Sequence, residues 1–377
     1  MRIPFNKPFI VGKELYYIAQ SVASGHIAGD GVFTRKCGEL LEGRLGAARV
    51  LLTPSCTAAL EMAAMLIDAG PGDEVIMPSY TFVSTANAFH LRGARPVFAD
   101  IRPDTLNIDP ALVEEAVTER TKAVVAVHYA GVGCDMDAIT ETASARGLHV
   151  IEDAAQALGA SYRGRPLGTI GALGALSFHE TKNFICGEGG ALVINDGRFV
   201  ERAEILREKG TDRSRFFRGE VDRYTWVDIG SSYLPSDLQA AFLYAQLENM
   251  DAITTRRGAI YRFYEQELSV LEAKGLARLP RLPAECAPNH HLFYLIVEDE
   301  TTRDGLIAHL KSRGILAVFH YVPLHLSKVG RRLGYREGML PVTEDLSRRL
   351  VRLPFFYSIT EAEQAEVARE IKTFLGA

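Results

Sequence analysis

The stretch "RVLLTPSCTAALEMAAMLIDAGPGDEVIMPS", residues 49–79, contains an apolar run, a helical pattern and a second apolar run. The same alternation continues to about residue 155. "EVIMPS" precedes "FVSTANAFHLRG", "RPVFADI" precedes "PALVEEAVTER", "KAVVAVHYAG" precedes "MDAITETASARG", and "LHVIEDAA" closes the series. Continuous apolar strands separated by helices are typical of a mostly parallel sheet that is covered on both faces. We therefore predict an α/β sandwich.

The chain has 377 residues, which is long for a single compact core, so we expect two domains. A long helical segment runs over residues 234–268, and shorter strand and helix patterns follow it. We place the boundary within this segment. The prediction is a large domain of residues 1–245, which includes the N-terminal segment, and a smaller α+β domain of residues 246–377.

Composition narrows the class of protein. Hydrophobic residues make up 47% and charged residues 24%, and the net charge of -5 gives no reason to expect a nucleic acid or an anionic membrane as partner. The five cysteines show no metal-type spacing and suggest reduced thiols. The start, "MRIPFNKPFIVGKEL", contains no signal-peptide pattern, and the longest apolar stretch is too short to span a bilayer. We expect a cytoplasmic protein.

Polar residues follow the apolar runs, and ligands of such sheets bind outside the carboxyl ends of the strands. These residues are Ser55-Cys56-Thr57, Ser79 to Phe82, His128-Tyr129, Asp153 with Gln156, and Ser177 to Lys182. We expect them to converge on one crevice.

Lys182 is the most informative of them. It lies in "LSFHETKNFICGEGGALVIND", residues 176–196, between two predicted strands. A lysine whose surroundings favour the neutral amine is a nucleophile toward carbonyls. With a carboxylate at an earlier strand end, here Asp153, this pattern is typical of pyridoxal phosphate (PLP) enzymes, in which the carboxylate keeps the pyridine nitrogen protonated. The alternatives are a surface charge for Lys182 and a helix N-cap for Asp153.

The segment "TPSCTAAL" offers a phosphate site, because a helix start carries free N–H groups and Thr57 adds a hydroxyl. Simple capping by Ser55 or Thr57 is the alternative. Phe82 is a candidate for stacking on the pyridine ring, although an aromatic residue at a helix start is more often part of the core.

The segments "SCTAAL", "PSYTFVSTANA", "EDAAQALGA", "SFHETKN", "GEGGA" and "FHYVPLH" together resemble the DegT/StrS-type sugar aminotransferases, which are PLP enzymes of fold type I. The resemblance covers nearly the whole chain. "FHETKN", "REKGTDRSRFFRGEVDRYTW" and "DIGSSYLPSDLQAA" are similar to the branch that aminates C4 of dTDP-4-keto-6-deoxyglucose, with glutamate as donor and pyridoxamine phosphate (PMP) as the second cofactor form.

This resemblance assigns a role to each matching position. Lys182 becomes the Schiff-base lysine, Asp153 the partner of the pyridine nitrogen, Gln156 a donor to the phenolic oxygen and Phe82 the stacking ring. The phosphate is lined by Cys56, Thr57 and Ser177. A related branch that removes a sugar hydroxyl has histidine at the lysine position, so Lys182 argues against that chemistry.

One position departs from the family pattern. Many members carry G-x-N-x-R where this chain has "GSSYL", residues 230–234. In those members the asparagine reaches the cofactor phosphate of the neighbouring subunit, so the resemblance implies a homodimer with shared active sites. Ser232 occupies the asparagine position, and its shorter hydroxyl retains the ability to donate, directly or through water.

The candidates for substrate binding are Arg213, Arg215 and Arg218, whose guanidinium groups suit a nucleotide diphosphate, and His179, His320 and Tyr321, which suit sugar hydroxyls. A solvated basic loop and ordinary partly buried histidines are the alternatives. The adjacent pair His290-His291 lacks further ligand spacing, so we expect no metal site. Two other functions stay open: an aminotransferase for a different nucleotide-keto-sugar, and a PLP-binding regulator.

Overall fold

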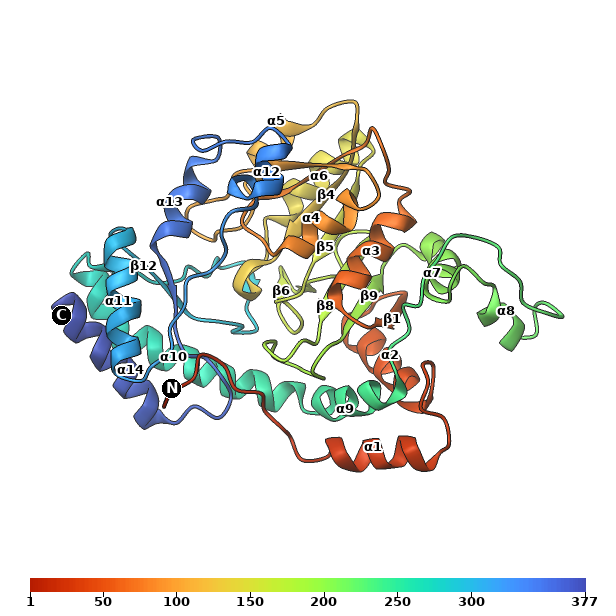
Figure 1. Cartoon of the computed structure of the whole chain (residues 1–377), viewed down its shortest axis with the longest axis horizontal. Helices are drawn as coiled ribbons and strands as arrows, with labels where there is room; N and C mark the ends of the chain where they lie inside the picture. The colour runs from red at the N-terminus through yellow and green to blue at the C-terminus, as the bar shows by residue number, and fades with distance from the viewer.

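The computed structural model describes all 377 residues and is built around a seven-stranded sheet (Figure 1). Its strand order is β1-β9-β8-β5-β4-β2-β3. Only β9 runs antiparallel to its neighbours. The strands are β1 (Arg49–Thr53), β2 (Glu74–Pro78), β3 (Arg95–Ala99), β4 (Thr121–Val127), β5 (His149–Asp153), β8 (Leu173–Ser177) and β9 (Gly190–Ile194). Each predicted strand of residues 49–153 is present, and the sheet is mostly parallel as predicted.

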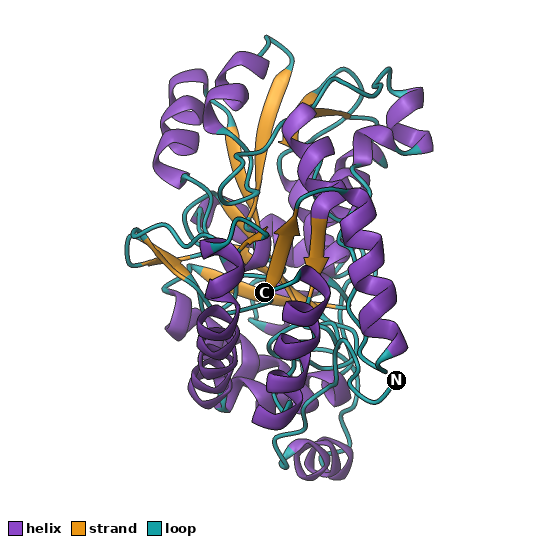
Figure 2. Ribbon diagram, turned by 90° about the vertical axis from the view of Figure 1, so that its left-hand side faces the viewer, coloured by secondary structure: helices purple, strands orange, loops and turns teal.

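Both faces of this sheet are apolar, and strand periodicity divides the side chains between two cores. In β4, Val124 and Ala126 belong to one core, whereas Ala123 and Val125 belong to the other. The first core includes residues of α2, α6 and α9, and the second includes residues of α3, α4 and α7. Figure 2 shows helices on both sides of the strands. These helices are α2 (Val32–Leu45), α3 (Cys56–Leu66), α4 (Val83–His90), α6 (Met136–Arg146), α7 (Val200–Arg207) and α9 (Asp237–Glu248).

The long helical segment is divided in the structure. Helix α9 ends at Glu248, and α10 (Met250–Ala273) begins after Asn249, whose φ of -108° and ψ of 17° leave the helical range. The apolar pattern crosses this point, which is why the sequence predicts one segment. The start of α9 is fixed by a capping box between Ser236 and Gln239.

The C-terminal part packs around a third core that includes residues of α10, α11 and α14 and of a sheet of order β10-β12-β13. Ile3 also belongs to this core and pairs with Ile315. The first residues of the chain therefore pack against the C-terminal part, and the division at 245/246 stays a prediction. The elements are β10 (Ala277–Arg278), β12 (Tyr294–Val297), β13 (Leu350–Arg352), α11 (Glu300–Ser312), α13 (Pro341–Arg349) and α14 (Glu361–Leu375).

The remaining elements are short or peripheral. They are α1 (Glu14–Ala23), α5 (Pro110–Ala116), α8 (Arg213–Phe217), α12 (Lys328–Arg332), β6 (Ser161–Tyr162), β7 (Arg165–Pro166), β11 (Cys286–Ala287), and the 3-10 turns Tyr129–Gly131, Gly197–Phe199 and Leu324–Leu326. Helix α8 projects from the body of the molecule at the right of Figure 1. No helix has both the length and the apolar character needed to cross a membrane.

Candidate active site

A cavity of about 490 Å³ opens at the carboxyl ends of β1, β2, β4, β5 and β8. It brings together the predicted residues Cys56, Thr57, Phe82, Asp153, Gln156, Ser177, His179, Lys182, His320 and Tyr321. Segments that lie more than 260 residues apart in the chain therefore meet in one pocket. The predicted crevice is present.

Lys182 lies in the loop between β8 and β9 and faces this pocket. Its backbone N–H donates to the carbonyl of His179 at 2.8 Å, which closes a turn. Its Nζ atom has no hydrogen-bond or ion-pair partner in the chain. Burial lowers the pKa of the Lys182 amine below its usual value, and the positive charge of Arg352 lowers this pKa further, against the opposing influence of Cys56 and Asp153. The site favours the neutral, nucleophilic amine.

Asp153 is the last residue of β5 and is 6% exposed. Its Oδ2 accepts a hydrogen bond from the hydroxyl of Thr85 at 2.7 Å, and its Oδ1 accepts one from the N–H of Ala155 at 3.2 Å. The hydroxyl of Thr81 lies 2.8 Å from that of Thr85. Because turns follow Asp153, the helix N-cap alternative is wrong. The carboxylate is instead fixed at the edge of the pocket.

The start of α3 forms an anion site. Ser55 caps the helix by accepting from the N–H of Ala58 at 3.1 Å, as the capping alternative anticipated. The N–H groups of Cys56 and Thr57 have no acceptor within the helix. The Thr57 hydroxyl does not cap the helix, and it lies 2.7 Å from the Ser84 hydroxyl. Two N–H groups, the helix dipole and paired hydroxyls fit a phosphate group.

Gly190 allows β9 to approach this helix start. A Cβ atom at position 190 would lie 2.4 Å from the backbone N of Cys56 and 2.4 Å from the backbone carbon of Ser55. Both are main-chain atoms of the anion site, so they have little freedom to move. The close approach explains why this strand begins with a glycine.

Replacing Gly190 by alanine should therefore displace the start of α3. We expect a loss of about 1–3 kcal/mol in the free energy of unfolding, as for other overpacked cores, together with weaker cofactor binding. Thermal unfolding and cofactor titration measure the two effects. Gly43→Ala is the control, since nothing lies within 4 Å of its added Cβ and this exposed helical position should be neutral or stabilised. Equal effects of the two substitutions would contradict the steric argument.

Gln156 has a fixed amide orientation. Its Oε1 accepts from the N–H of Ala130 at 2.7 Å, and its Nε2 donates to the hydroxyl of Tyr321 at 3.1 Å. Gln156 lines the pocket with its amide held in this orientation. Phe82 is 57% exposed, and its ring centroid lies 6.4 Å from that of Tyr321. Phe82 is thus available to a planar ligand and is not a core residue.

His320 stacks on Tyr321 with ring centroids 3.6 Å apart, and its Nδ1 lies 2.8 Å from the Tyr129 hydroxyl. Burial lowers the pKa of His320 well below its usual value, so the ring is neutral. His179 lies at the pocket mouth, where its Nε2 is 3.7 Å from the Glu188 carboxylate. Imidazole nitrogens and hydroxyls of this kind suit the recognition of sugar hydroxyls.

The four residues that the sequence assigned to the diphosphate and to the partner's cofactor phosphate lie outside this pocket. Arg213 pairs with Glu208, Arg215 with Glu201 and Glu220, and Arg218 with Glu204 and Glu220. Ser232 is exposed and forms a backbone bridge with Glu208. The structure does not bring these residues together with Lys182 in one chain, and their roles stay predictions.

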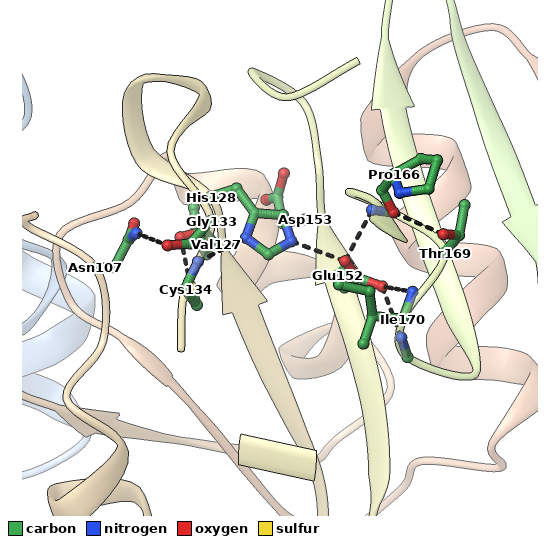
Figure 3. A network of polar contacts seen from close by, with 12 residues as sticks. Asn107, Val127, His128, Gly133, Cys134, Glu152, Asp153, Pro166, Thr169 and Ile170 are labelled. Atoms are coloured by element: carbon green, nitrogen blue, oxygen red, sulfur yellow. Dashed lines mark hydrogen bonds and ion pairs between the residues drawn. The ribbon is translucent and has the colours of Figure 1, made fainter. Parts of the chain in front are cut away.

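Ser79, Tyr80, His128 and Tyr129 are corrections to the predicted crevice, because they are buried and do not line the pocket. Figure 3 shows the ring of His128 directed toward Glu152. His128 is fully buried, and its Nε2 donates to Glu152 at 2.9 Å while its Nδ1 accepts from the N–H of Cys134 at 3.2 Å. The Glu152 carboxylate also accepts hydrogen bonds from three backbone N–H groups, those of Gly168, Ile170 and Gly171. This network joins the ends of β4 and β5 to the segment before β8.

Several pocket residues had not been singled out from the sequence. Ser84 lines the pocket and comes from the quoted segment "PSYTFVSTANA". Thr85, which donates to Asp153, lies in the same segment, but nothing in the sequence distinguished these two residues from their neighbours. Phe5, His291 and Arg352 also line the pocket. An arginine within the apolar run "LVRLPFF" was the available signal for Arg352. His291 contacts Asn183 at 2.9 Å, and no group of three or more metal-type ligands occurs in the structure.

The residues present fit PLP. The pocket offers an amine without a partner, a buried carboxylate and a phosphate site, which match the aldehyde, the pyridine nitrogen and the phosphate of that cofactor. When bound, PLP supplies an electron sink. Lys182, Asp153 and the start of α3 are the groups that would hold it.

Comparison with known proteins identifies the family. The model of the DegT/DnrJ/EryC1/StrS aminotransferase family matches residues 9–372. The aminotransferase TlmJ from Streptoalloteichus hindustanus is 32% identical, with a TM-score of 0.91 over 99% of each chain. The PMP form of a putative sugar aminotransferase, Spr1654 from Streptococcus pneumoniae, is 26% identical, with a TM-score of 0.92 over 99% of each chain.

A protein named pleiotropic regulatory protein, from Geobacillus stearothermophilus, is 37% identical over 318 residues, which cover 84% of this chain and 82% of that protein. The solved neighbours confirm the predicted fold type I architecture, and they include PLP and PMP forms. The chain thus belongs to the DegT/DnrJ/EryC1/StrS family of PLP-dependent aminotransferases.

Proposed function

We propose that this protein transfers an amino group from glutamate to C4 of dTDP-4-keto-6-deoxyglucose, giving dTDP-4-amino-4,6-dideoxygalactose. The observation that carries the transamination chemistry is the unpaired amine of Lys182, in one pocket with the buried carboxylate of Asp153. The sugar class is supported by the family. The C4 position, the dTDP group and the glutamate donor are supported by the similarity of residues 178–183, 207–226 and 228–241 to that branch.

The chain's own groups divide the work as follows. Lys182 would take a proton from the reacting carbon of the donor in one half-reaction and deliver a proton to the keto carbon of the sugar in the other, since an amine acts first as a base and then as an acid. Asp153 places a negative charge where the cofactor ring nitrogen must stay protonated. His179, His320 and Tyr321 hold sugar hydroxyls. Such polar contacts reject analogues strongly, because a missing partner leaves a buried group without its hydrogen bond.

We also propose a homodimer in which α8 and Ser232 complete the pocket of the partner. Large apolar side chains near α8 are exposed, among them Phe217 at 68% and Trp226 at 80%. Clustered apolar exposure of this kind is typical of interaction surfaces. The arginines of this segment, which do not reach the pocket of their own chain, would then lie near the diphosphate bound by the partner.

Arg218→Gln tests this arrangement. We expect the apparent KM for the nucleotide sugar to rise about 5- to 10-fold with little change in kcat, because the arginine contributes to substrate binding rather than to the transition state alone. Steady-state kinetics provide the measurement. Arg198→Gln, which removes another exposed arginine from an ion pair, is the control. Unchanged KM in both variants would remove Arg218 from the substrate site.

The substrate assignment is tested by incubating the protein with glutamate and, separately, with 3-keto and 4-keto nucleotide sugars. We expect 2-oxoglutarate to form with the 4-keto sugar, and NMR to locate the new amine at C4. The sugar without its nucleotide should be a very poor substrate. Amination only at C3, or no turnover of either sugar, would overturn the assignment.

The regulator is the second candidate, and the Geobacillus relative is the observation that favours it. A regulator would bind the cofactor without releasing 2-oxoglutarate. The same incubation therefore distinguishes the two functions, because multiple turnovers per protein molecule are incompatible with a sensor that only binds its ligands.

A further inference from the structure

Arg352 brings a positive charge to the pocket, and no anionic side chain of the protein pairs with it. It is the last residue of β13 and lines the cavity with Lys182. Its side chain forms no hydrogen bond or ion pair, and its Nε atom is buried without a partner. Arg349, three residues earlier, instead pairs with Asp345 and with the carbonyl of Val297.

The guanidinium of Arg352 is nevertheless held in place. Its backbone exchanges two hydrogen bonds with Val318, at 2.7 and 3.1 Å. Its guanidinium carbon lies 4.7 Å from the centroid of the Phe5 ring. An aromatic face covers one side of the cation, and both side chains line the pocket. The arginine is therefore positioned before any ligand arrives.

The acidic groups of the pocket do not neutralise it. Asp153 is engaged by Thr85 and Ala155, and Glu188 lies beside His179 with a side chain 67% exposed. The nearby tyrosine hydroxyls are also committed, since Tyr80 donates to the carbonyl of His320 and Tyr129 contacts the ring of His320. A cation in such surroundings is costly unless an anion pairs with it, so the structure calls for an anion from outside the chain.

Position decides which anion fits. The start of α3 already provides for the cofactor phosphate. Arg352 lies close enough to Lys182 for its charge to lower the pKa of the Lys182 amine. In an amino acid the α-carboxylate is attached to the reacting carbon, whereas the diphosphate of a nucleotide sugar is separated from its keto carbon by the sugar ring.

We propose that Arg352 binds the α-carboxylate of the amino donor. A guanidinium fork matches the two oxygens of a carboxylate, and this contact would place the donor's reacting carbon near Lys182. The inference rests on the transamination part of the proposed function and not on the identity of the sugar.

Measuring the two half-reactions separately tests the role of Arg352 in donor binding independently of the identity of the sugar. PLP-loaded protein is mixed with glutamate and no sugar, and the absorbance of the cofactor follows the donor half-reaction. We expect Arg352→Gln to lower its efficiency about 100-fold, as for the loss of one partner from a buried charged pair, and Arg352→Lys to lower it less. Arg349→Gln is the control and should match the wild type. PMP-loaded Arg352→Gln should still react with the keto-sugar within about threefold of wild type.

L-Alanine has only an α-carboxylate. Arg352→Gln should therefore lower the efficiency of the donor half-reaction with L-alanine by the same factor as with glutamate. If the efficiency fell with glutamate but not with L-alanine, Arg352 would contact the side-chain carboxylate, and the proposal would be overturned. An equal fall in efficiency in both half-reactions, or a fall in the sugar half-reaction alone, would also overturn it. If the wild type reacts with glutamate but with no keto-sugar, the sugar assignment fails while the Arg352 test stands.

Two binding measurements do not depend on turnover. α-Methylglutamate, which has no α-proton to lose, should bind Arg352→Gln about 100-fold more weakly than wild type, measured by calorimetry. In wild-type holoenzyme, phenylglyoxal should modify Arg352 and α-methylglutamate should protect it, as peptide mapping can show. Modification of Arg352 at the same rate with saturating α-methylglutamate would contradict the proposal even if the variant failed to fold.

Discussion

Replacing Lys182 by alanine should abolish transamination, with kcat reduced by at least about 10⁴-fold. The variant loses both the nucleophile and the group that moves the proton, and proton transfer alone contributes about 10²- to 10⁴-fold. Cofactor in the PMP form should still bind, because Asp153 and the start of α3 remain. Single-turnover kinetics and the absorbance spectrum are the measurements.

Lys311→Ala is the matched control for this substitution. Lys311 is exposed on α11, outside the pocket, so its removal should leave activity unchanged. Residual activity of Lys182→Ala within tenfold of wild type would mean that another group takes the proton. Loss of PMP binding together with activity would indicate a folding defect instead, which thermal unfolding would reveal.

Asp153→Asn should lower kcat by about 10²- to 10³-fold while the protein still folds and binds cofactor. The amide keeps the shape and removes the charge, and loss of one electrostatic group at a reacting centre has effects of this size. Thr85→Val is the companion variant. It leaves the carboxylate and removes one hydrogen bond to it, so its effect should be about tenfold. Turnover of Asp153→Asn near that of wild type would assign Asp153 a structural role only.

The large domain was predictable because its local patterns agree with its fold. Each strand from β1 to β5 is a mostly apolar run with a polar residue at its end or shortly after it, and the parallel order places these ends at one edge. Lys182 and Asp153 could be found for this reason, since Asp153 ends β5 and Lys182 follows β8, and these two strands are neighbours in the sheet. The break at Asn249 was not predictable, because the apolar pattern continues through it.

Other parts of the site depend on contacts that no local pattern contains. Thr85 supports Asp153 from a helix 68 residues earlier in the chain. Arg352 enters the pocket from the C-terminal sheet, and its environment is set by Phe5 at the other end of the chain. His128 follows a strand as a site residue would, yet it is buried against Glu152. Sequence position alone does not distinguish a side chain that faces the pocket from one that faces the core.

Borohydride reduction of the PLP-loaded wild-type protein, followed by peptide mapping, tests most directly whether Lys182 carries the chemistry of this pocket. Reduction makes the lysine–cofactor link permanent, so the modified residue can be identified by mass. The structure predicts one cofactor adduct, on the peptide that contains "HETKNF", and none in Lys182→Ala. An adduct on any other lysine, or none on protein that holds PLP, would contradict the assignment.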